Sequence, residues 1–358
     1  MSPISKSNSK TKSTIQDVAE LAGVSKMTVS RVLNNDEKVS DKTRLKVKEA
    51  ANKLHYRPNI SARRLASAKS YFIGLLYENP SQGGYVSQFM MSALKSCRQR
   101  GYHLVVDECE GTQVEKLTIT RDLVEETRVD GVILLPPFCN NIEILNELKA
   151  LNVPYIRVSP DVELTQSPFV CMDDYQAAFE MTNLLIEQGH IDIAFIIGHP
   201  DVGASRLRYQ GFLDAMRSNK LTIPPEYIEQ GLFSYKSGLS AAKALLTCNN
   251  MPTAIFASND DMAAAVISVA NSLGIQVPQQ LSVVGYDDTS IATTIWPNIT
   301  TVKQPIEAMA EAAIAMLTTG KFDQGLSDKL SDLRHVLDFE LKQRDSTSRV
   351  KSSLIPNA

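Results

Sequence analysis

Three short stretches near the start of the chain carry apolar residues at the spacing of one helix face. The first should begin after Thr14, which opens a capping-box pattern, and should end at Gly23. Ser25 can cap the second, and the third begins near Ser40 and must end before Pro58, which disfavours helical backbone in the residue ahead of it. The predicted inward-facing residues are Ile15, Val18, Ala19, Ala22, Val29, Val32, Leu33, Leu45, Val47, Ala50, Ala51 and Leu54. This pattern predicts helix-turn-helix geometry, with the second helix in the recognition position.

From Tyr71 onward, short apolar runs alternate with amphipathic stretches, which is the pattern of βαβ units around a parallel sheet. The predicted strands are Phe72–Tyr77, His103–Asp107, Gly131–Leu135, Tyr155–Val158, Ile193–Ile197, Ala254–Ser258 and Ser282–Gly285. The intervening helices should end near Gly101, Gly189, Gly274 and Gly320, because glycine accepts the left-handed conformation of a C-cap. About 270 residues suit two such sheets, folded as two lobes, better than one.

Charge divides the chain into a basic start and an acidic body. Residues 1–70 hold 15 Lys/Arg and 6 Asp/Glu, a net charge of +9, whereas the remaining residues hold 22 and 34, a net charge of −12. A small basic module suits a polyanion such as nucleic acid or an anionic membrane, and a solvated basic tail is the alternative. The composition, 43% hydrophobic and 22% charged, excludes a disordered or fibrous chain.

Membrane, metal and redox functions find little support in the composition. No stretch approaches the roughly 20 apolar residues that span a bilayer, and the Ser/Lys-rich start lacks the apolar run of a signal peptide. We therefore expect a cytoplasmic protein with no membrane partner. The cysteines are odd in number and form no C-x-x-C pair, which is typical of reduced thiols, so neither a metal nor a cofactor is expected. They are Cys97, Cys109, Cys139, Cys171 and Cys248.

The outward face of the second predicted helix carries side chains that can read DNA. Arg31 can reach guanine or a phosphate, Met27 can touch a thymine methyl group, and Lys26 and Ser30 can meet base edges or backbone. The alternative is the solvated surface of a small three-helix bundle. A short polar-faced helix after a glycine turn, within a segment of charge +9, favours DNA binding.

The segment Thr14–Ser67 resembles the headpiece of the lactose/galactose-repressor (LacI/GalR) family, through the string "DVAELAGVSKMTVSRVLN". The resemblance implies that Lys26, Met27 and Arg31 face operator bases, and that residues 59–67 form a hinge helix that orders on the operator. Leu65 would then wedge into the minor groove, as a bulky apolar residue in a short basic stretch can. The predicted DNA-binding residues are Thr14, Ser25, Lys26, Met27, Thr28, Ser30, Arg31, Asn34, Asn59, Ala62, Arg63, Leu65 and Ala66.

Polar and aromatic residues follow the predicted strands of the body, at the edge where open α/β sheets bind ligands. Glu78 and Asn79 follow the first strand, and Asp287 follows the last. Carboxylate, amide and guanidinium groups that converge with aromatic faces are what a sugar-like polyol needs. Generic turn residues and helix caps would give the same pattern.

The body resembles the effector domain of the same family, itself similar to periplasmic sugar-binding proteins, through strings such as "PTAIFASNDDMAAAV" and "LSVVGYDDTSIATTIWPNITTVKQP". The resemblance implies effector contacts at Arg208, Asn259 and Asp287, with Phe233 in the aromatic wall. Ser159 stands where an acidic residue is common, which leaves the identity of the ligand open. The predicted effector-binding residues are Glu78, Asn79, Tyr85, Ser159, Arg208, Phe233, Asn259, Asp287 and Trp296.

Pattern and resemblance together predict an all-α helix-turn-helix headpiece with a hinge helix, followed by an α/β two-lobed effector domain like the periplasmic binding proteins. The expected segments are a flexible tail (1–13), the helix-turn-helix domain (14–58), the hinge (59–69), the effector-binding and dimerisation domain (70–345) and a second flexible tail (346–358). The expected lobes are 71–171 plus 303–333 and 172–302 plus 334–345.

The predicted function is ligand-responsive, sequence-specific regulation of transcription: repression of carbohydrate uptake or catabolism genes that a sugar or sugar derivative relieves. A homodimer would place two headpieces on a pseudo-palindromic double-stranded operator, and the C-terminal tail lacks the leucine heptads of a tetramerisation zipper. A nucleobase or a corepressor is the alternative ligand. An enzyme is not expected, because the carboxylates of pairs such as Asp260 and Asp261 point apart and no complete phosphate loop or H-E-x-x-H motif occurs.

Overall fold

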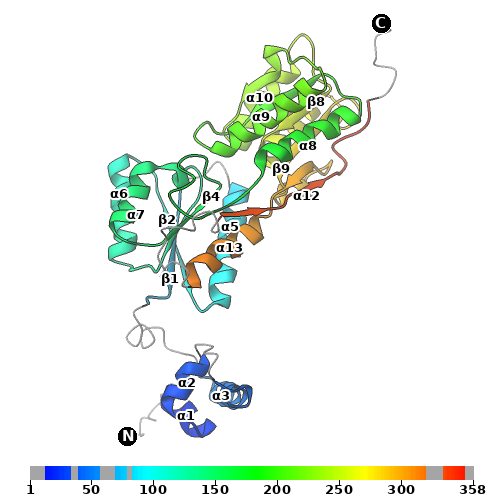
Figure 1. Ribbon diagram of the computed structural model, residues 1–358. Coiled ribbons are helices and arrows are strands. Elements are labelled where there is room, and N and C mark those ends of the chain that lie inside the picture. Colours follow the sequence, from blue (N-terminus) through cyan, green and yellow to red (C-terminus); the bar gives the residue numbers. More distant parts are fainter. Residues whose placement is uncertain (1–12, 34–38, 57–68, 79–82, 320–333, 351–358) are drawn as a thin grey trace, which may run out of the picture. The chain divides into compact units, whose positions relative to one another are not determined.

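The computed structural model describes residues 13–33, 39–56, 69–78, 83–319 and 334–350. Residues 1–70 and residues 71–358 form two compact units, each of which is described by itself (Figure 1). The helices of the first unit are α1 (Ile15–Ala22), α2 (Lys26–Leu33) and α3 (Asp41–Lys53). The order of these helices confirms the helix-turn-helix prediction.

Local caps and one glycine set the helices of the first unit. Thr14 and Asp17 form the predicted capping box, and Gly23 ends α1 with a φ of 65°, a left-handed conformation that glycine adopts without strain. The buried side chains of all three helices form one small core. Leu45 was predicted to join this core and does not, because its side chain is 62% exposed. It precedes the buried Val47 by two positions, which places it on the opposite face of α3.

The second unit contains two six-stranded sheets, each the centre of one lobe. The first sheet has the order β11-β5-β4-β3-β1-β2 and all of its pairings are parallel. Its strands are β1 (Phe72–Tyr77), β2 (His103–Glu108), β3 (Val132–Leu134), β4 (Tyr155–Val158), β5 (Phe169–Met172) and β11 (Arg334–Leu337). The first lobe also holds α5 (Gly83–Gln99), α6 (Gln113–Glu125), the 3-10 turn η1 (Phe138–Asn140), α7 (Ile142–Ala150) and α13 (Ile306–Thr318).

The second sheet has the order β12-β10-β9-β8-β6-β7, and only β12 is antiparallel to its neighbour. Its strands are β6 (Ile193–Ile197), β7 (Ile228–Gln230), β8 (Ala254–Ala257), β9 (Ser282–Asp287), β10 (Thr300–Lys303) and β12 (Glu340–Lys342). The helices of this lobe are α8 (Asp174–Glu187), α9 (Gly203–Ser218), η2 (Pro225–Tyr227), α10 (Tyr235–Leu246), α11 (Asp260–Ser272) and α12 (Ile291–Thr294).

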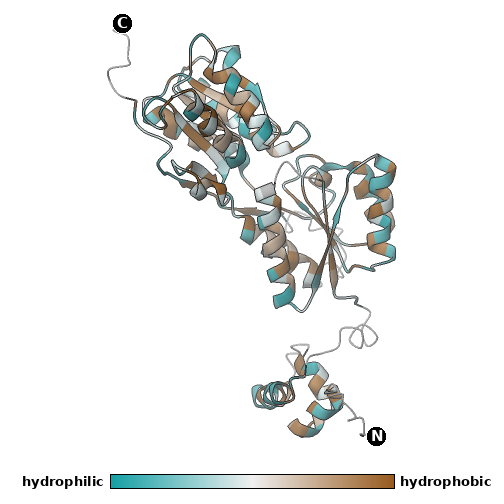
Figure 2. Ribbon diagram, turned by 180° about the vertical axis from the view of Figure 1, so that it is seen from behind, coloured by the Kyte–Doolittle hydropathy of each residue, from teal (hydrophilic) through white to brown (hydrophobic). Residues whose placement is uncertain are grey.

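Helices cover both faces of each sheet, and the core lies between them. In the first lobe, α5 and α13 pack on one face and α6 and α7 on the other. In the second lobe, α10 and α11 pack on one face and α8 and α9 on the other. Figure 2 shows mostly hydrophobic strands between helices that carry both hydrophobic and hydrophilic residues. Strands buried on both faces explain why continuous apolar runs, rather than alternation, marked them in the sequence.

The C-terminal part of the chain contributes strands to both lobes, which differs from the prediction. Residues 334–337 form β11, which pairs with β5 in the first sheet, although residues 334–345 were expected in the second lobe. The expected flexible tail after residue 345 is also wrong for its first residues. Ser346 is fully buried, where its hydroxyl donates to Val283 O at 2.6 Å, and Val350 N donates to Gln188 O at 2.9 Å.

Candidate DNA-binding surface and effector pocket

One face of α2 is polar and exposed, and the opposite face is buried. Val29 and Val32 are buried in the core of the first unit, which directs Lys26, Met27 and Arg31 outward. Met27 is 65% exposed. This face therefore offers two cations and one apolar contact on a single short helix.

Other predicted DNA contacts sit at helix starts or are half-buried. Ser25 Oγ accepts from Thr28 N at 3.1 Å, so this hydroxyl holds the first turn of α2. Thr14 N donates to Asp17 Oδ2 at 2.7 Å, and this backbone bond is the main reason why the pKa of Asp17 lies below its usual value. Thr28 and Ser30 are half-buried. The remaining predicted DNA contacts, Asn34, Asn59, Ala62, Arg63, Leu65 and Ala66, lie outside the described residues.

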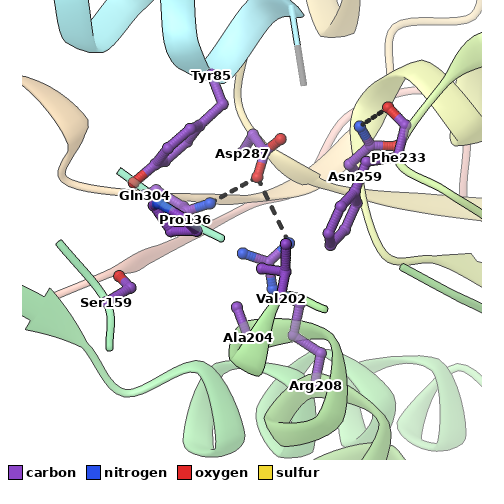
Figure 3. Close-up of a pocket in the computed structure, with 10 residues that line it drawn as sticks. All are labelled: Tyr85, Pro136, Ser159, Val202, Ala204, Arg208, Phe233, Asn259, Asp287 and Gln304. Atoms are coloured by element: carbon purple, nitrogen blue, oxygen red, sulfur yellow. Dashed lines mark hydrogen bonds and ion pairs between the residues drawn. The ribbon is translucent and has the colours of Figure 1, made fainter. Parts of the chain in front are cut away.

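A cavity of about 360 Å³ opens between the two lobes of the second unit (Figure 3). Side chains from both lobes and from the segment between β10 and α13 line it. The lining residues are Tyr85, Pro136, Ser159, Val202, Ala204, Arg208, Phe233, Asn259, Asp287 and Gln304. Six of the nine predicted effector contacts are in this set.

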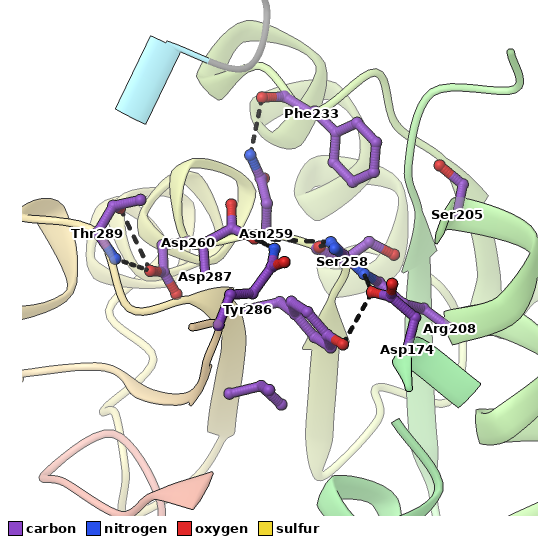
Figure 4. Close-up of polar contacts among 12 residues, drawn as sticks. Asp174, Ser205, Arg208, Phe233, Ser258, Asn259, Asp260, Tyr286, Asp287 and Thr289 are labelled. Carbon is purple, nitrogen blue, oxygen red and sulfur yellow. Dashed lines mark hydrogen bonds and ion pairs between the residues drawn. The ribbon is translucent and has the colours of Figure 1, made fainter. Parts of the chain in front are cut away.

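Arg208 is the buried charge at the floor of the cavity. Its Nε donates to Asp174 Oδ1 at 2.8 Å, its Nη1 donates to Ser258 O at 2.6 Å, and Nη1 lies 3.7 Å from Asp287 Oδ1 (Figure 4). The guanidinium also lies 3.6 Å from the centre of the Tyr286 ring. Burial works against its charge, yet the neighbouring carboxylates raise the pKa of Arg208 above its ordinary value.

Asp287 is the carboxylate that faces the cavity opposite Arg208. Its Oδ1 accepts from Gln304 Nε2 at 2.6 Å. Burial raises the pKa of Asp287 to about 7, against the lowering effects of Arg208 and Gln304. Since a neutral pKa in a cleft is typical of functional carboxylates, Asp287 is the strongest candidate for a titrating ligand contact.

Three residues of the cavity have backbone conformations that side chains rarely adopt. The φ angles are 47° at Ser159, 58° at Phe233 and 112° at Asp287. Such residues cost about 1–3 kcal/mol each and concentrate at ligand-binding sites. Phe233 is fixed further by Asn259, whose Nδ2 donates to Phe233 O at 2.9 Å while its Oδ1 caps α11 by accepting from Met262 N at 3.0 Å.

Tyr85 and Ser159 bring the first lobe to the cavity. Tyr85 lies at the start of α5, and burial raises the pKa of its hydroxyl, which stays protonated. Ser159 directly follows β4, the strand that carries the fully buried Arg157. Arg157 does not line the cavity; its guanidinium donates to Val162 O at 2.8 Å and Glu163 O at 2.6 Å, and so supports the loop after β4.

Two predicted effector contacts are outside the cavity lining. Glu78 forms an ion pair with Lys116, at 2.6 Å between Oε1 and Nζ, which occupies its carboxylate. Trp296 is 74% exposed. It follows α12, several residues beyond the end of β9, and so does not stand directly at a strand end. Asn79 lies outside the described residues.

Four lining residues escaped the sequence reasoning: Pro136, Val202, Ala204 and Gln304. The first three are apolar residues in loops or at a helix start, so no chemical signal distinguishes them. Gln304 follows β10 as the other contacts follow their strands, and this position could have marked it. Asp174, which pairs with Arg208, was not among the predicted effector contacts either.

Asp260, one of the adjacent carboxylates considered for catalysis, has a structural role. Asp260 is fully buried, with Oδ1 accepting from Thr301 Oγ1 at 2.6 Å and Oδ2 accepting from Thr289 N at 2.8 Å, so it fixes two loops of the second lobe. Burial holds its pKa well above the usual range. Within the described ranges, no three His, Cys, Asp or Glu side chains are grouped to hold a metal ion. No described helix is both long and apolar enough to cross a membrane.

The fold and the cavity define a class of protein, a regulator that joins a helix-turn-helix unit to a two-lobed ligand-binding domain. Residues 14–59 match the LacI family of bacterial regulatory proteins, and residues 182–347 match a periplasmic binding protein-like domain. The chain is 32% identical to the probable HTH-type transcriptional repressor ExuR of Bacillus subtilis, over 94% of this chain and 99% of the relative. It is 34% identical to the ribose operon repressor of Escherichia coli, over 85% and 92%.

Solved structures of the same kind cover nearly the whole chain. The lac repressor dimer bound to operator and an anti-inducer matches with a TM-score of 0.71 and 29% identity, over 94% of this chain and 99% of that one. A complex of the regulator CelR with cellobiose matches with a TM-score of 0.68 and 28% identity, over 93% and 99%. The chain belongs to the LacI family and is a DNA-binding transcriptional regulator, as the sequence predicted.

Proposed function

We propose that this regulator represses genes of carbohydrate uptake or catabolism as a homodimer on a pseudo-palindromic operator. A small neutral sugar or polyol that binds between the lobes would release the operator. One observation carries this proposal. The cavity is lined by the guanidinium of Arg208 and the carboxylate of Asp287, which can hydrogen-bond a ligand, and by the aromatic rings of Tyr85 and Phe233. Bidentate polar groups beside aromatic walls are the usual chemistry of sugar recognition.

Charge balance at the cavity supports a neutral effector. Arg208 is the only Lys or Arg among the lining residues that the structure describes, and Asp174 and Asp287 already compensate it. A phosphate or carboxylate on the ligand would meet no free cation there and would lie near the carboxylate of Asp287. Hydroxyl groups can instead donate to Asp287 and accept from Arg208 without adding charge to a buried site.

The small size of the cavity favours a ligand with one sugar ring. Its 360 Å³ includes space that is open to solvent, so the enclosed part is smaller still. Cellobiose, which has two rings, is bound by CelR, a structural match with 28% identity. We expect a monosaccharide in this chain instead.

The first unit supplies the DNA-binding half of the proposal. The exposed Lys26, Met27 and Arg31 of α2 would enter the major groove of each half-site. We propose that residues 59–69 form a hinge that transmits the state of the lobes to this unit. Operator release would require a coupling of about 1–3 kcal/mol between the two sites.

No enzymatic activity is part of the proposed function. Support comes from Asp260, whose two carboxylate oxygens are both used to hold loops, and from Asp174, which pairs with Arg208. We place the protein in the cytoplasm, where bacterial DNA is available to it.

A thermal-shift screen tests the class of effector. The panel contains D-glucose, D-galactose, D-fructose and D-ribose, with D-glucuronate, glucose 6-phosphate, cellobiose, hypoxanthine and guanine as alternatives. A neutral monosaccharide at 100 times its Kd should stabilise the protein by about 2.7 kcal/mol and weaken operator binding. Stabilisation by a purine base, or only by an anionic sugar, would contradict the proposal.

A further inference from the structure

One carboxylate connects the two lobes beside the cavity. Asp161 lies in the loop after β4 in the first lobe, and its Oδ2 accepts from Arg206 Nη2 of α9 in the second lobe at 2.7 Å. Its Oδ1 accepts from Asn140 Nδ2, and Asn140 Oδ1 accepts from Asp161 N at 3.1 Å. The Asp161 side chain is 9% exposed and that of Arg206 is 69% exposed, so the pair is partly shielded from solvent.

The start of α9 is shaped to receive this carboxylate. A Cβ atom on Gly203, the first residue of α9, would lie 2.2 Å from Cγ of Asp161, a distance that atoms do not tolerate. Glycine at this position therefore permits the close approach of the two lobes. The φ angle of Gly203 is not in the left-handed region, so backbone conformation does not require glycine there.

The loop that carries Asp161 is held firmly from its own lobe. Arg157 donates to the carbonyl groups of the two residues that follow Asp161, and its Nε donates to Ser167 Oγ at 2.8 Å. Ser159, two residues before Asp161, lines the cavity, as do Val202 and Ala204 on either side of Gly203. The connection thus joins the two chain segments that border the cavity from opposite lobes.

We propose that Asn140, Asp161, Gly203 and Arg206 form an interlobe clasp, in which Asp161 is a positioning residue that holds the lobes closed over the cavity. None of these four residues lines the cavity. These residues therefore stabilise the closed position of the lobes and do not contact the ligand. A ligand that requires closed lobes binds more weakly when the closed state is less populated.

The first test measures amide hydrogen exchange by mass spectrometry in the full-length protein without added sugar. The variants are Asp161→Asn, Arg206→Gln and Gly203→Ala. The matched control is Arg217→Gln, because Arg217 also lies on α9 but pairs with Asp214 of the same helix, at 2.7 Å. The readout is exchange in residues 161–166 of the first lobe and in residues 203–207 of the second.

The clasp predicts effects that cross from one lobe to the other. Arg206→Gln and Gly203→Ala should each speed exchange in residues 161–166 by about two- to fivefold, the change expected for loss of one partly exposed ion pair. Asp161→Asn should speed exchange in residues 203–207 by a similar factor, and combining it with Arg206→Gln should add little. Arg217→Gln should leave residues 161–166 unchanged.

Gly203→Ala separates the clasp from a purely local role. Alanine favours helix over glycine, so a local effect would slow exchange at the start of α9 and leave the first lobe alone. Unchanged exchange in residues 161–166 in both second-lobe variants would overturn the clasp.

A second measurement links the clasp to the proposed function. The monosaccharide with the largest thermal shift in the panel should bind Asp161→Asn about two- to fivefold more weakly than wild type. If no monosaccharide in the panel binds wild type, the proposed effector class is wrong, and the exchange measurements still decide whether the clasp exists.

Discussion

Arg208→Met should destabilise the second unit strongly, because it removes the cation that lies between two buried carboxylates. Methionine has a similar length and leaves little cavity, so lost electrostatics dominate the effect. In wild type, Arg208 pairs with Asp174 at 2.8 Å and lies 3.7 Å from Asp287. Removing one partner of a buried pair costs about 3–5 kcal/mol, because the remaining charge stays desolvated.

The cost should also depend on pH, with a sign that follows from Asp287. Its pKa is already raised to about 7 by burial, and loss of Arg208 removes an interaction that lowers it. A carboxyl group whose pKa is higher in the folded state destabilises that state as pH rises from its unfolded pKa toward its folded pKa. Arg208→Met should therefore lose more stability at pH 8 than at pH 6.

Urea unfolding followed by far-ultraviolet circular dichroism, at pH 6 and at pH 8, measures both effects. Arg217→Met on the same helix is the control. Its side chain is 75% exposed and pairs with Asp214, so its loss should cost at most about 1 kcal/mol at either pH. Asp174→Asn should recover part of the stability of Arg208→Met. Equal costs for Arg208→Met and Arg217→Met, or a cost of Arg208→Met that does not change with pH, would refute the electrostatic account.

Three further outcomes are expected. Arg31→Ala should weaken operator binding in a mobility-shift assay by about 1–3 kcal/mol without changing the thermal shift caused by sugar. In wild type, calorimetric affinity for the active monosaccharide should fall below about pH 7, where Asp287 becomes protonated, and Asp287→Asn should remove that dependence. Burial lowers the pKa of His190, so the contribution of this residue to the free energy of unfolding falls as pH drops from 7 to 5; relative to wild type, His190→Gln should therefore lose less stability at pH 5 than at pH 7 in urea unfolding.

Most strands that the sequence located are buried on both faces, and the partly exposed edge strand β2 is the exception. The predicted bounds of β1, β4 and β6 match the structure; β1 and β6 are continuous apolar runs, and β4 is apolar except for Arg157. Five strands of three or four residues were not predicted: the edge strands β7, β11 and β12, whose residues are partly exposed, and the interior strands β5 and β10. Their stability comes from pairing with strands far away in the sequence, as β11 does with β5.

The candidate site was also predicted only in part. Asp287 stands at a strand end, where open α/β sheets bind ligands, but turn residues and helix caps give the same pattern, so the family resemblance was needed to single out Arg208 and Asp287. An aromatic residue after a strand can face the cleft or the solvent, and Trp296 is 74% exposed and outside the cavity lining. Asp161 and Arg206 were not predicted at all. Their pairing depends on how the lobes close, which no local pattern encodes.

Arg208 and Asp287 hydrogen-bond or pair with residues of two segments that connect the lobes, so we expect ligand binding and lobe movement to be coupled. Asp174 begins α8 directly after the connection from β5, and its Oδ1 accepts from both Arg208 Nε and the Tyr286 hydroxyl group, at 2.8 and 2.9 Å. Gln304 lies in the connection from β10 to α13 and donates to Asp287 at 2.6 Å. A sugar that hydrogen-bonds Arg208 and Asp287 competes with these bonds, so it acts directly on two connections between the lobes. Coupling of about 1–3 kcal/mol, enough to change operator affinity about 5- to 150-fold, is within what two such charge-assisted bonds can supply.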